Sequence, residues 1–234
     1  MYQDAEEMSL KQKTLKGLSW SFIDSFSSQL ISFVVMIVLA RMLEPEEFGI
    51  LGYIFIFVSL AGPFIEGGFA QALIKKTNCT TADYSTAFFF NFAMGIVTAG
   101  LLYVAAPLIS HLLAVPQMTP MLRVMGIFFI ICAVGTIQGT IFTKKLDFKT
   151  KAFVSIGSST LAGVIAIIMA YCGLGVWSLI WRIILGAGFG SLVLWMISDW
   201  RPSFIFSKKN FKELFGFGYK FFLSDLIRNI YDNL

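Results

Sequence analysis

The stretch that decides the fold is residues 48–74, FGILGYIFIFVSLAGPFIEGGFAQALI, in which Glu66 is the only charged residue. Crossing the roughly 30 Å hydrocarbon layer of a membrane takes about 20 helical residues, and this run is long enough. A bare carboxylate costs free energy in lipid and in a protein core alike. The stretch therefore predicts a membrane-spanning helix and raises the question of what Glu66 does in it.

The rest of the chain repeats this apolar pattern. Its 234 residues are 57% hydrophobic and only 14% charged, whereas a soluble domain carries about a quarter charged residues. We therefore expect an all-α, polytopic membrane protein with six complete spans in residues 1–213 and the start of a seventh in residues 214–234. The predicted spans lie near residues 20–43, 48–74, 86–113, 121–142, 152–173 and 176–197, with the last from about 215 onward.

The basic residues predict how the spans are oriented. They gather in the N-terminal arm and in every second connection, and the alternate connections hold almost none. The positive-inside rule then places the N-terminus in the cytoplasm and the acidic turn EPEEFG, residues 44–49, outside. The net charge of +4 is an orientation signal and not a nucleic-acid surface, because the cations are divided among short segments. They are Lys11, Lys13, Lys16, Lys75, Lys76, Lys144, Lys145, Lys149, Lys151, Arg201, Lys208, Lys209 and Lys212.

Motifs for catalysis or cofactor binding do not stand out in the sequence. The longest connection, residues 198–213, is too short for a catalytic domain and contains no Gly-rich phosphate loop and no Ser–His–Asp set. The three cysteines have neither metal-binding nor redox spacing. We expect a protein that is not an enzyme and binds no metal or cofactor, with a membrane-embedded transferase as the alternative.

Charged residues inside the spans are scattered singly over separate helices, a pattern that suits a cavity lining better than a reaction centre. The first span carries Asp24 and Gln29 beside serines at helical spacing, which makes one polar stripe. Glu66 and Arg182 lie too deep in their spans to reach the membrane surface easily, and Asp225 lies in the seventh. Intramembrane charges of this kind indicate a functional site or a functional ion pair.

Glycine and proline residues predict local backbone behaviour in two places. Pro63, Gly67 and Gly68 surround the buried carboxylate of the second span, so that helix is expected to be kinked or loosened. Gly17 and Gly218 each precede an aspartate by seven residues after a basic, aromatic entry. This echo suggests that a second six-helix repeat begins near residue 214, as in transporters built from repeats.

Several long segments carry a resemblance to a known family. They are LISFVVMIVLARMLEPEEFGILGYIFIFVSLAGPFIEGGFAQALIKK, APLISHLLAVPQMTPMLRVMGIFFI, KKLDFKTKAFVSIGSSTLAGVIAIIMAYCGLGVWSLI and WRPSFIFSKKNFKELFGFGYKFFLSDLIRNIYDNL. In order and spacing they resemble the bacterial polysaccharide flippases, the lipid-linked oligosaccharide exporters of the multidrug/oligosaccharidyl-lipid/polysaccharide superfamily. The match covers nearly the whole chain.

The resemblance implies a fold, a cargo and a location. The fold is two six-helix lobes around a central cavity that works by alternating access, and this chain would end where the second lobe should begin. The cargo is a polyprenyl-pyrophosphate-linked oligosaccharide, moved across the bacterial cytoplasmic membrane for polysaccharide biosynthesis. Membrane lipids and polysaccharide polymerase machinery are the further partners it suggests, and nucleic acid is not one. A drug/cation antiporter of the same superfamily is the alternative.

The cargo also suggests which residues bind it. Pyrophosphate needs cations, and the planar guanidinium of arginine holds phosphate in two places. Arg182 is the first candidate for this role, and Arg123, near the outer mouth, is the second. Asp24 and Gln29 are expected to bind the substrate from the first span.

Two carboxylates are candidates for coupling transport to an ion gradient. Glu66 and Asp225 are expected to hold the coupling ion. Three roles stay open for Glu66, namely taking up a proton, holding a cation and pairing with an arginine.

Overall fold

The computed structural model describes residues 2–232, and the side chains of residues 2–14, 66, 230 and 232 lie outside the described part. Within that range every regular element is a helix, which confirms the predicted all-α fold. The helices are α1 Tyr2–Ala40, α2 Pro45–Glu66, α3 Phe69–Lys75, α4 Thr81–Leu112, α5 Met118–Lys144, α6 Phe148–Tyr171, α7 Val176–Ile197 and α8 Lys208–Asp232.

Six of the described helices are long and apolar enough to cross a membrane. They correspond to the six complete spans predicted from the sequence, and the chain is a multi-pass membrane protein. In the first of them the spanning part is Leu15–Ala40, which continues without a break from the N-terminal arm. The predicted seventh span differs, because α8 begins at Lys208 and carries Lys220, Asp225 and Arg228 among its apolar residues. It is therefore not one of the six.

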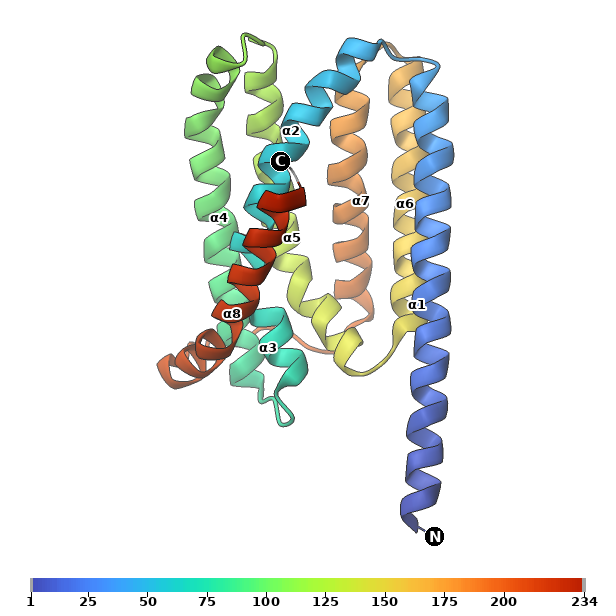
Figure 1. The fold of residues 1–234 in the computed structure, drawn as a ribbon, viewed down its shortest axis with the longest axis vertical. Helices are drawn as coiled ribbons and strands as arrows, with labels where there is room; N and C mark the ends of the chain where they lie inside the picture. The colour runs from blue at the N-terminus through green and yellow to red at the C-terminus, as the bar shows by residue number, and fades with distance from the viewer. Residues whose placement is uncertain (1, 233–234) are drawn as a thin grey trace.

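The helices form two groups with α2 crossing between them. On one side α1 packs against α6 and α6 against α7, and on the other α4 packs against α5 (Figure 1). Contacts between α5 and α7 join the groups. α2 contacts α4, α5 and α7, and α8 lies against α2, α3 and α4. This arrangement leaves α1 in contact with α6 while its opposite side faces away from the other helices.

The sequence GPFIEGG breaks the second span into two helices. α2 ends at Glu66 and α3 starts at Phe69, with Gly67 at φ 53° and Gly68 at φ 72° between them. Both are left-handed conformations that glycine adopts at little cost. A Cβ atom on Gly68 would lie 2.0 Å from the backbone oxygen of Gly218 in α8, so the two backbones touch. The predicted kink is therefore a complete break that α8 packs against.

Lysines at one end of the bundle hold the helix termini together. The Nζ atom of Lys76 lies 3.0 Å from a carboxylate oxygen of Asp83 and 3.0 Å from one of Glu213, joining the α3–α4 turn to α8. Burial acts to lower the pKa of Lys76, but the hydrogen bonds and charges of these two carboxylates outweigh it and raise that pKa. Lys144 Nζ donates to the carbonyl oxygen of Leu73 at 2.7 Å, at the end of α3. These lysines therefore have a structural role in joining the helix ends.

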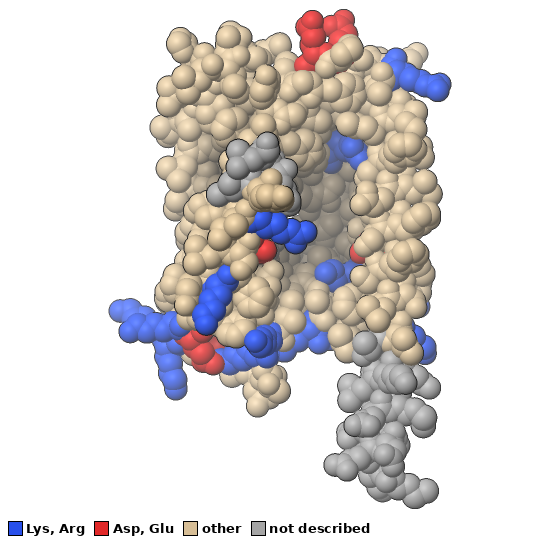
Figure 2. Space-filling view, viewed as in Figure 1, with Lys and Arg blue, Asp and Glu red and all other residues tan. Residues whose placement is uncertain are grey.

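The acidic turn lies at the opposite end and has a structural role of its own. Glu47 accepts a hydrogen bond from the backbone N–H of Glu44, which closes a capping box at the start of α2. The other carboxylate oxygen of Glu47 accepts from the backbone N–H of Val176, at 3.1 Å, and so ties α2 to the start of α7. Figure 2 shows acidic residues at this end and most cations toward the other. The predicted orientation assumes that the cations gather at one end of the bundle, and the structure has this uneven distribution.

Candidate substrate-binding groove

A polar groove runs along the side of α1 that faces α6 and α7. Its wall on α1 consists of Asp24, Ser25, Ser28, Gln29 and Ser32, the polar stripe predicted from helical spacing. Figure 2 shows a hollow on this face of the molecule with charged side chains inside it. We call this feature the α1 groove.

Three adjoining cavities make up the α1 groove. The first, of about 270 Å³, lies between α1, α6 and α7 and is lined by Asp24, Lys151 and Ser155 among others. The second, of about 350 Å³, also contains Asp24 and Ser155 and extends to Gln29 and Ser32. The third, of about 330 Å³, again contains Gln29 and Ser32 and reaches Arg182. Because neighbouring cavities share lining residues, the groove is continuous from Lys151 to Arg182.

Arg182 is half-buried in the second turn of α7, in the third cavity. Its neighbours there are Gln29 and Ser32 of α1 and apolar side chains that include Leu51 and Phe55 of α2. Among the residues whose side chains are described, none forms a hydrogen bond or ion pair with the guanidinium. A desolvated cation without a partner is costly, so this site favours an anionic ligand.

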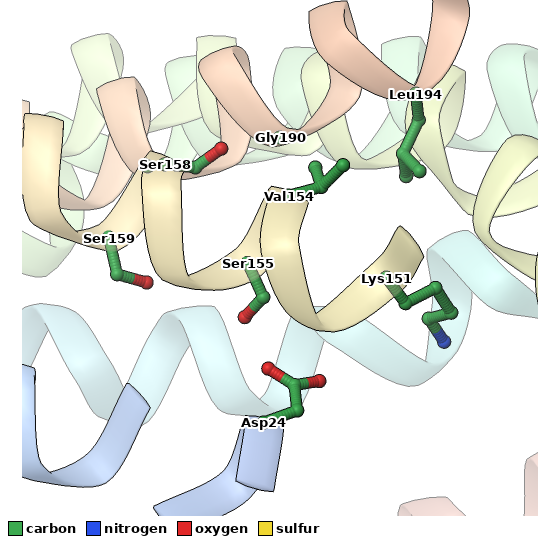
Figure 3. A pocket seen from close by; sticks show the side chains of 9 residues that line it. Asp24, Lys151, Val154, Ser155, Ser158, Ser159, Gly190 and Leu194 are labelled. Atoms are coloured by element: carbon green, nitrogen blue, oxygen red, sulfur yellow. The ribbon is translucent and has the colours of Figure 1, made fainter. Parts of the chain in front are cut away.

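Lys151 lies in the first turn of α6 and points into the first cavity (Figure 3). Its Nζ atom donates to the hydroxyl oxygen of Thr143 at 2.8 Å. Asp24 lines the same cavity but is not within ion-pairing distance, and no other described carboxylate is. The groove therefore holds a second cation that is free of a direct salt bridge.

Asp24 belongs to a hydrogen-bonded link between α1 and α6. It accepts a hydrogen bond from the hydroxyl of Ser28 at 3.3 Å, and the hydroxyl oxygens of Ser28 and Ser155 lie 3.1 Å apart. Figure 3 shows the Asp24 carboxylate pointing from α1 toward Ser155 of α6. With the amide of Gln29, these groups offer both donors and acceptors, as a ligand rich in hydroxyl groups requires.

The structure brings together three of the predicted site residues, Asp24, Gln29 and Arg182, in the α1 groove. Arg123 lies elsewhere: it is exposed on α5, and its guanidinium carbon is 4.5 Å from the centre of the Tyr103 ring on α4. Asp225 is half-buried on α8, and it does not line any of the three groove cavities. The side chain of Glu66 lies outside the described residues, so its predicted role stays a prediction.

Lys151 is the groove residue that the sequence reasoning missed, because it was counted as a cation of a connecting loop. The boundary predicted for that span, residue 152, is wrong by four residues. Asp147 accepts a hydrogen bond from the backbone N–H of Thr150 at 3.1 Å and caps α6, so the helix already starts at Phe148. The signal that could have found Lys151 is its helical spacing to Ser155, four residues on, along one face.

Comparison with protein families identifies the chain over most of its length. Residues 38–234 match the family described as "Polysaccharide biosynthesis protein". No solved structure matches the chain significantly.

Individual relatives carry related names. The succinoglycan biosynthesis transport protein ExoT of Rhizobium meliloti (strain 1021) is 27% identical over 87% of this chain and 42% of that protein. The teichuronic acid biosynthesis protein TuaB of Bacillus subtilis (strain 168) is 26% identical over 90% of this chain and 44% of that protein. The lipopolysaccharide biosynthesis protein WzxC of Escherichia coli (strain K12) is 27% identical over 67% and 32%. The chain thus spans less than half the length of each of these relatives.

The extent of the family match decides the identity, since it covers more than half of the chain. The names of the relatives agree with the resemblance to polysaccharide flippases that the sequence motifs indicated. The chain belongs to the polysaccharide biosynthesis protein family of membrane proteins.

Proposed function

We propose that this chain supplies half the lining of a cavity through which a polyprenyl-pyrophosphate-linked oligosaccharide crosses the bacterial cytoplasmic membrane. The α1 groove is the part of the lining that contacts the cargo. In this role the protein is a transporter that works by alternating access and not an enzyme. The family and the transport name of one relative support a membrane-transport role in polysaccharide biosynthesis.

The observation that carries the proposal is the half-buried guanidinium of Arg182, which lines the α1 groove from a membrane-spanning helix and has no hydrogen-bond or ion-pair partner among the described side chains. Five N–H donors without a protein partner suit a doubly charged phosphate or pyrophosphate, which arginine binds with two parallel hydrogen bonds. The serine hydroxyls, Asp24 and Gln29 along α1 suit the hydroxyl groups of the attached sugars. Both parts of the cargo then have matching groups in one groove.

The open side of the α1 groove is consistent with a second half of the protein. The chain covers 42% of ExoT and 44% of TuaB, so those relatives have room for a second lobe of similar size. In our proposal such a lobe begins near residue 214 and closes the cavity from the side opposite α1. The N-terminus and the Lys-rich connections face the cytoplasm.

Glu66 and Asp225 are the proposed coupling residues. Glu66 ends α2 at the break beside Gly67 and Gly68, where a change in backbone conformation is least costly. Uptake of a proton or cation at this break would bias one state of the transporter over the other. An ion pair between Glu66 and an arginine is the structural alternative.

Translocation of the proposed cargo is the test. The complete product of the gene is reconstituted in vesicles with a fluorescent lipid-linked oligosaccharide, and a membrane-impermeant quencher measures how much of it crosses the bilayer. We expect transfer that depends on the protein. A drug/cation antiporter, which Asp24 would suit, would instead move a fluorescent hydrophobic cation. Movement of that cation without movement of the oligosaccharide would contradict the proposal.

A further inference from the structure

Lys151 and Arg182 lie near opposite ends of the α1 groove. Lys151 is in the first turn of α6, beside the Lys-rich end of the bundle, and Arg182 is in the second turn of α7, near the end that holds Glu47. Leu194 lines the cavity of Lys151 and is twelve residues from Arg182 on α7. At 1.5 Å per residue, Leu194 and Arg182 are about 18 Å apart along the axis of α7, so the two cations lie at different levels of the groove.

The two cations share two properties: each is partly buried, and each lines the α1 groove. Lys76 has two carboxylate partners at 3.0 Å, but Lys151 and Arg182 have no carboxylate within ion-pairing distance in the described part of the chain. Both lie in helices that span the membrane. Partly buried cations in membrane-spanning helices, without a counter-ion among the described residues, indicate that a ligand supplies the negative charge.

On α1 the wall between the cations is polar and neutral apart from Asp24, whereas α2 and α7 contribute apolar side chains such as Leu51 and Leu179. It presents the hydroxyls of Ser25, Ser28 and Ser32 and the amide of Gln29, in cavities that share their lining residues. An anion that leaves one cation can therefore move along hydrogen-bonding groups to the other. Two linked phosphates are too short to bridge the two levels of the groove, about 18 Å apart along α7, and so reach one cation at a time.

We propose that the α1 groove contains two separate pyrophosphate sites, one at Lys151 and one at Arg182, which the cargo occupies in turn. This inference rests on the proposed function and adds to it an entry site near the Lys-rich end and an exit site near the Glu47 end. Binding at several sites of moderate affinity lets a charged group enter the groove and also leave it. Asp24 lies in the same cavity as Lys151, and its negative charge lowers the affinity of the entry site for pyrophosphate.

The experiment counts the sites with a soluble probe. Farnesyl pyrophosphate is titrated into the purified chain in detergent, where both ends of the groove are accessible, and calorimetry gives the number of molecules bound. Farnesol, which lacks the phosphates, corrects for partition of the tail into micelles. The variants are Lys151→Gln, Arg182→Gln and the two combined. Lys149→Gln is the matched control, because Lys149 is exposed and its Nζ lies 5.8 Å from the centre of the Trp20 ring.

We expect two sites in the unaltered chain and in Lys149→Gln. Each single variant should weaken one site by roughly ten- to a hundredfold and leave the other unchanged, since each removes a charge-assisted interaction. The double variant should bind no farnesyl pyrophosphate, and Lys151→Arg should keep both binding sites. Melting temperatures in the same detergent show that each variant is folded.

The outcomes that contradict the inference are distinct from those that contradict the proposed function. If the chain binds one molecule and each single variant abolishes it, the two cations share a single site. If Arg182→Gln weakens binding but Lys151→Gln binds both molecules normally, the site at Lys151 does not exist, and the proposed function stands. If neither variant alters binding, the cationic groove itself is not a pyrophosphate site.

Discussion

Replacing Gly68 with alanine should destabilise the protein more than any other glycine-to-alanine change in the second span. Gly68 caps the start of α3 with φ 72°, a conformation that an alanine adopts only with strain. Its added Cβ would also lie 2.0 Å from the backbone oxygen of Gly218, which cannot rotate away as a side chain can. Accommodating the methyl group requires α8 to separate from the break between α2 and α3.

The expected magnitude is the sum of two contributions. The left-handed backbone costs roughly 1–2 kcal/mol for a residue other than glycine. Forcing an extra methyl group into a tight contact costs roughly 1–3 kcal/mol. Gly68→Ala should therefore lower the free energy of unfolding by about 2–5 kcal/mol.

Two neighbouring glycines provide matched controls. Gly67 has φ 53°, but a Cβ there would meet the rings of Phe90 at 2.9 Å and Phe69 at 3.2 Å, and side chains can shift. Gly67→Ala should therefore cost mainly the backbone contribution of about 1–2 kcal/mol. Gly62 lies within α2 with nothing within 4 Å of the added Cβ, so Gly62→Ala should be neutral or stabilise by roughly 0.5–1 kcal/mol.

Unfolding of the purified chain in mixed detergent micelles, followed by circular dichroism as the denaturing detergent is increased, gives the three free energies. The contact between α8 and the break that separates α2 from α3 is supported if Gly68→Ala is the most destabilised variant, Gly67→Ala is intermediate and Gly62→Ala is the least destabilised. Equal stability of Gly68→Ala and Gly62→Ala would refute it.

Three other predictions concern orientation, coupling and stability. Single cysteines placed at Lys145 and Glu46 in a cysteine-free chain should react with impermeant reagents from the cytoplasmic and outer sides respectively; external labelling at 145 would overturn the orientation. Glu66→Gln should fold normally and lose gradient-driven export if Glu66 couples transport; folded protein that still exports in a gradient-dependent way would exclude that role. Asp83→Asn, which removes the charge beside Lys76, should lower the free energy of unfolding by roughly 1–3 kcal/mol in the same micelle assay; an unchanged value would contradict the structural role of this pair.

The sequence predicts the six complete spans, because hydropathy indicates which segments need lipid, but the seventh predicted span, α8, is not among the six. It also predicts the polar face of α1, since Asp24, Ser28 and Ser32 recur at helical spacing, and the backbone irregularity at Gly67 and Gly68. It does not predict that both glycines are left-handed or that Gly218 lies against the break. That contact joins residues far apart in the chain and depends on how α8 packs.

Depth in the membrane is predictable for a charged residue, but the direction in which it points is not. Arg123 and Arg182 both lie toward the N-terminal ends of their helices, yet Arg182 faces the α1 groove and Arg123 lies over the ring of Tyr103. The difference arises because α5 packs against α4 on one side and α7 on another. Lys151 was missed because its helix starts one turn earlier than hydropathy indicates, at the cap formed by Asp147.

The most direct test of the proposed function is the rate of oligosaccharide translocation per folded molecule in vesicles that contain Arg182→Gln or Arg41→Gln. Both changes remove one arginine charge, but Arg41 is exposed and lies outside the groove cavities. We predict that Arg182→Gln slows translocation by roughly ten- to a hundredfold, and that Arg182→Lys also slows it because lysine lacks the two-pronged contact with phosphate. Arg41→Gln should transport at the normal rate. Normal translocation by a well-folded Arg182→Gln protein would contradict the central claim that this guanidinium binds the cargo.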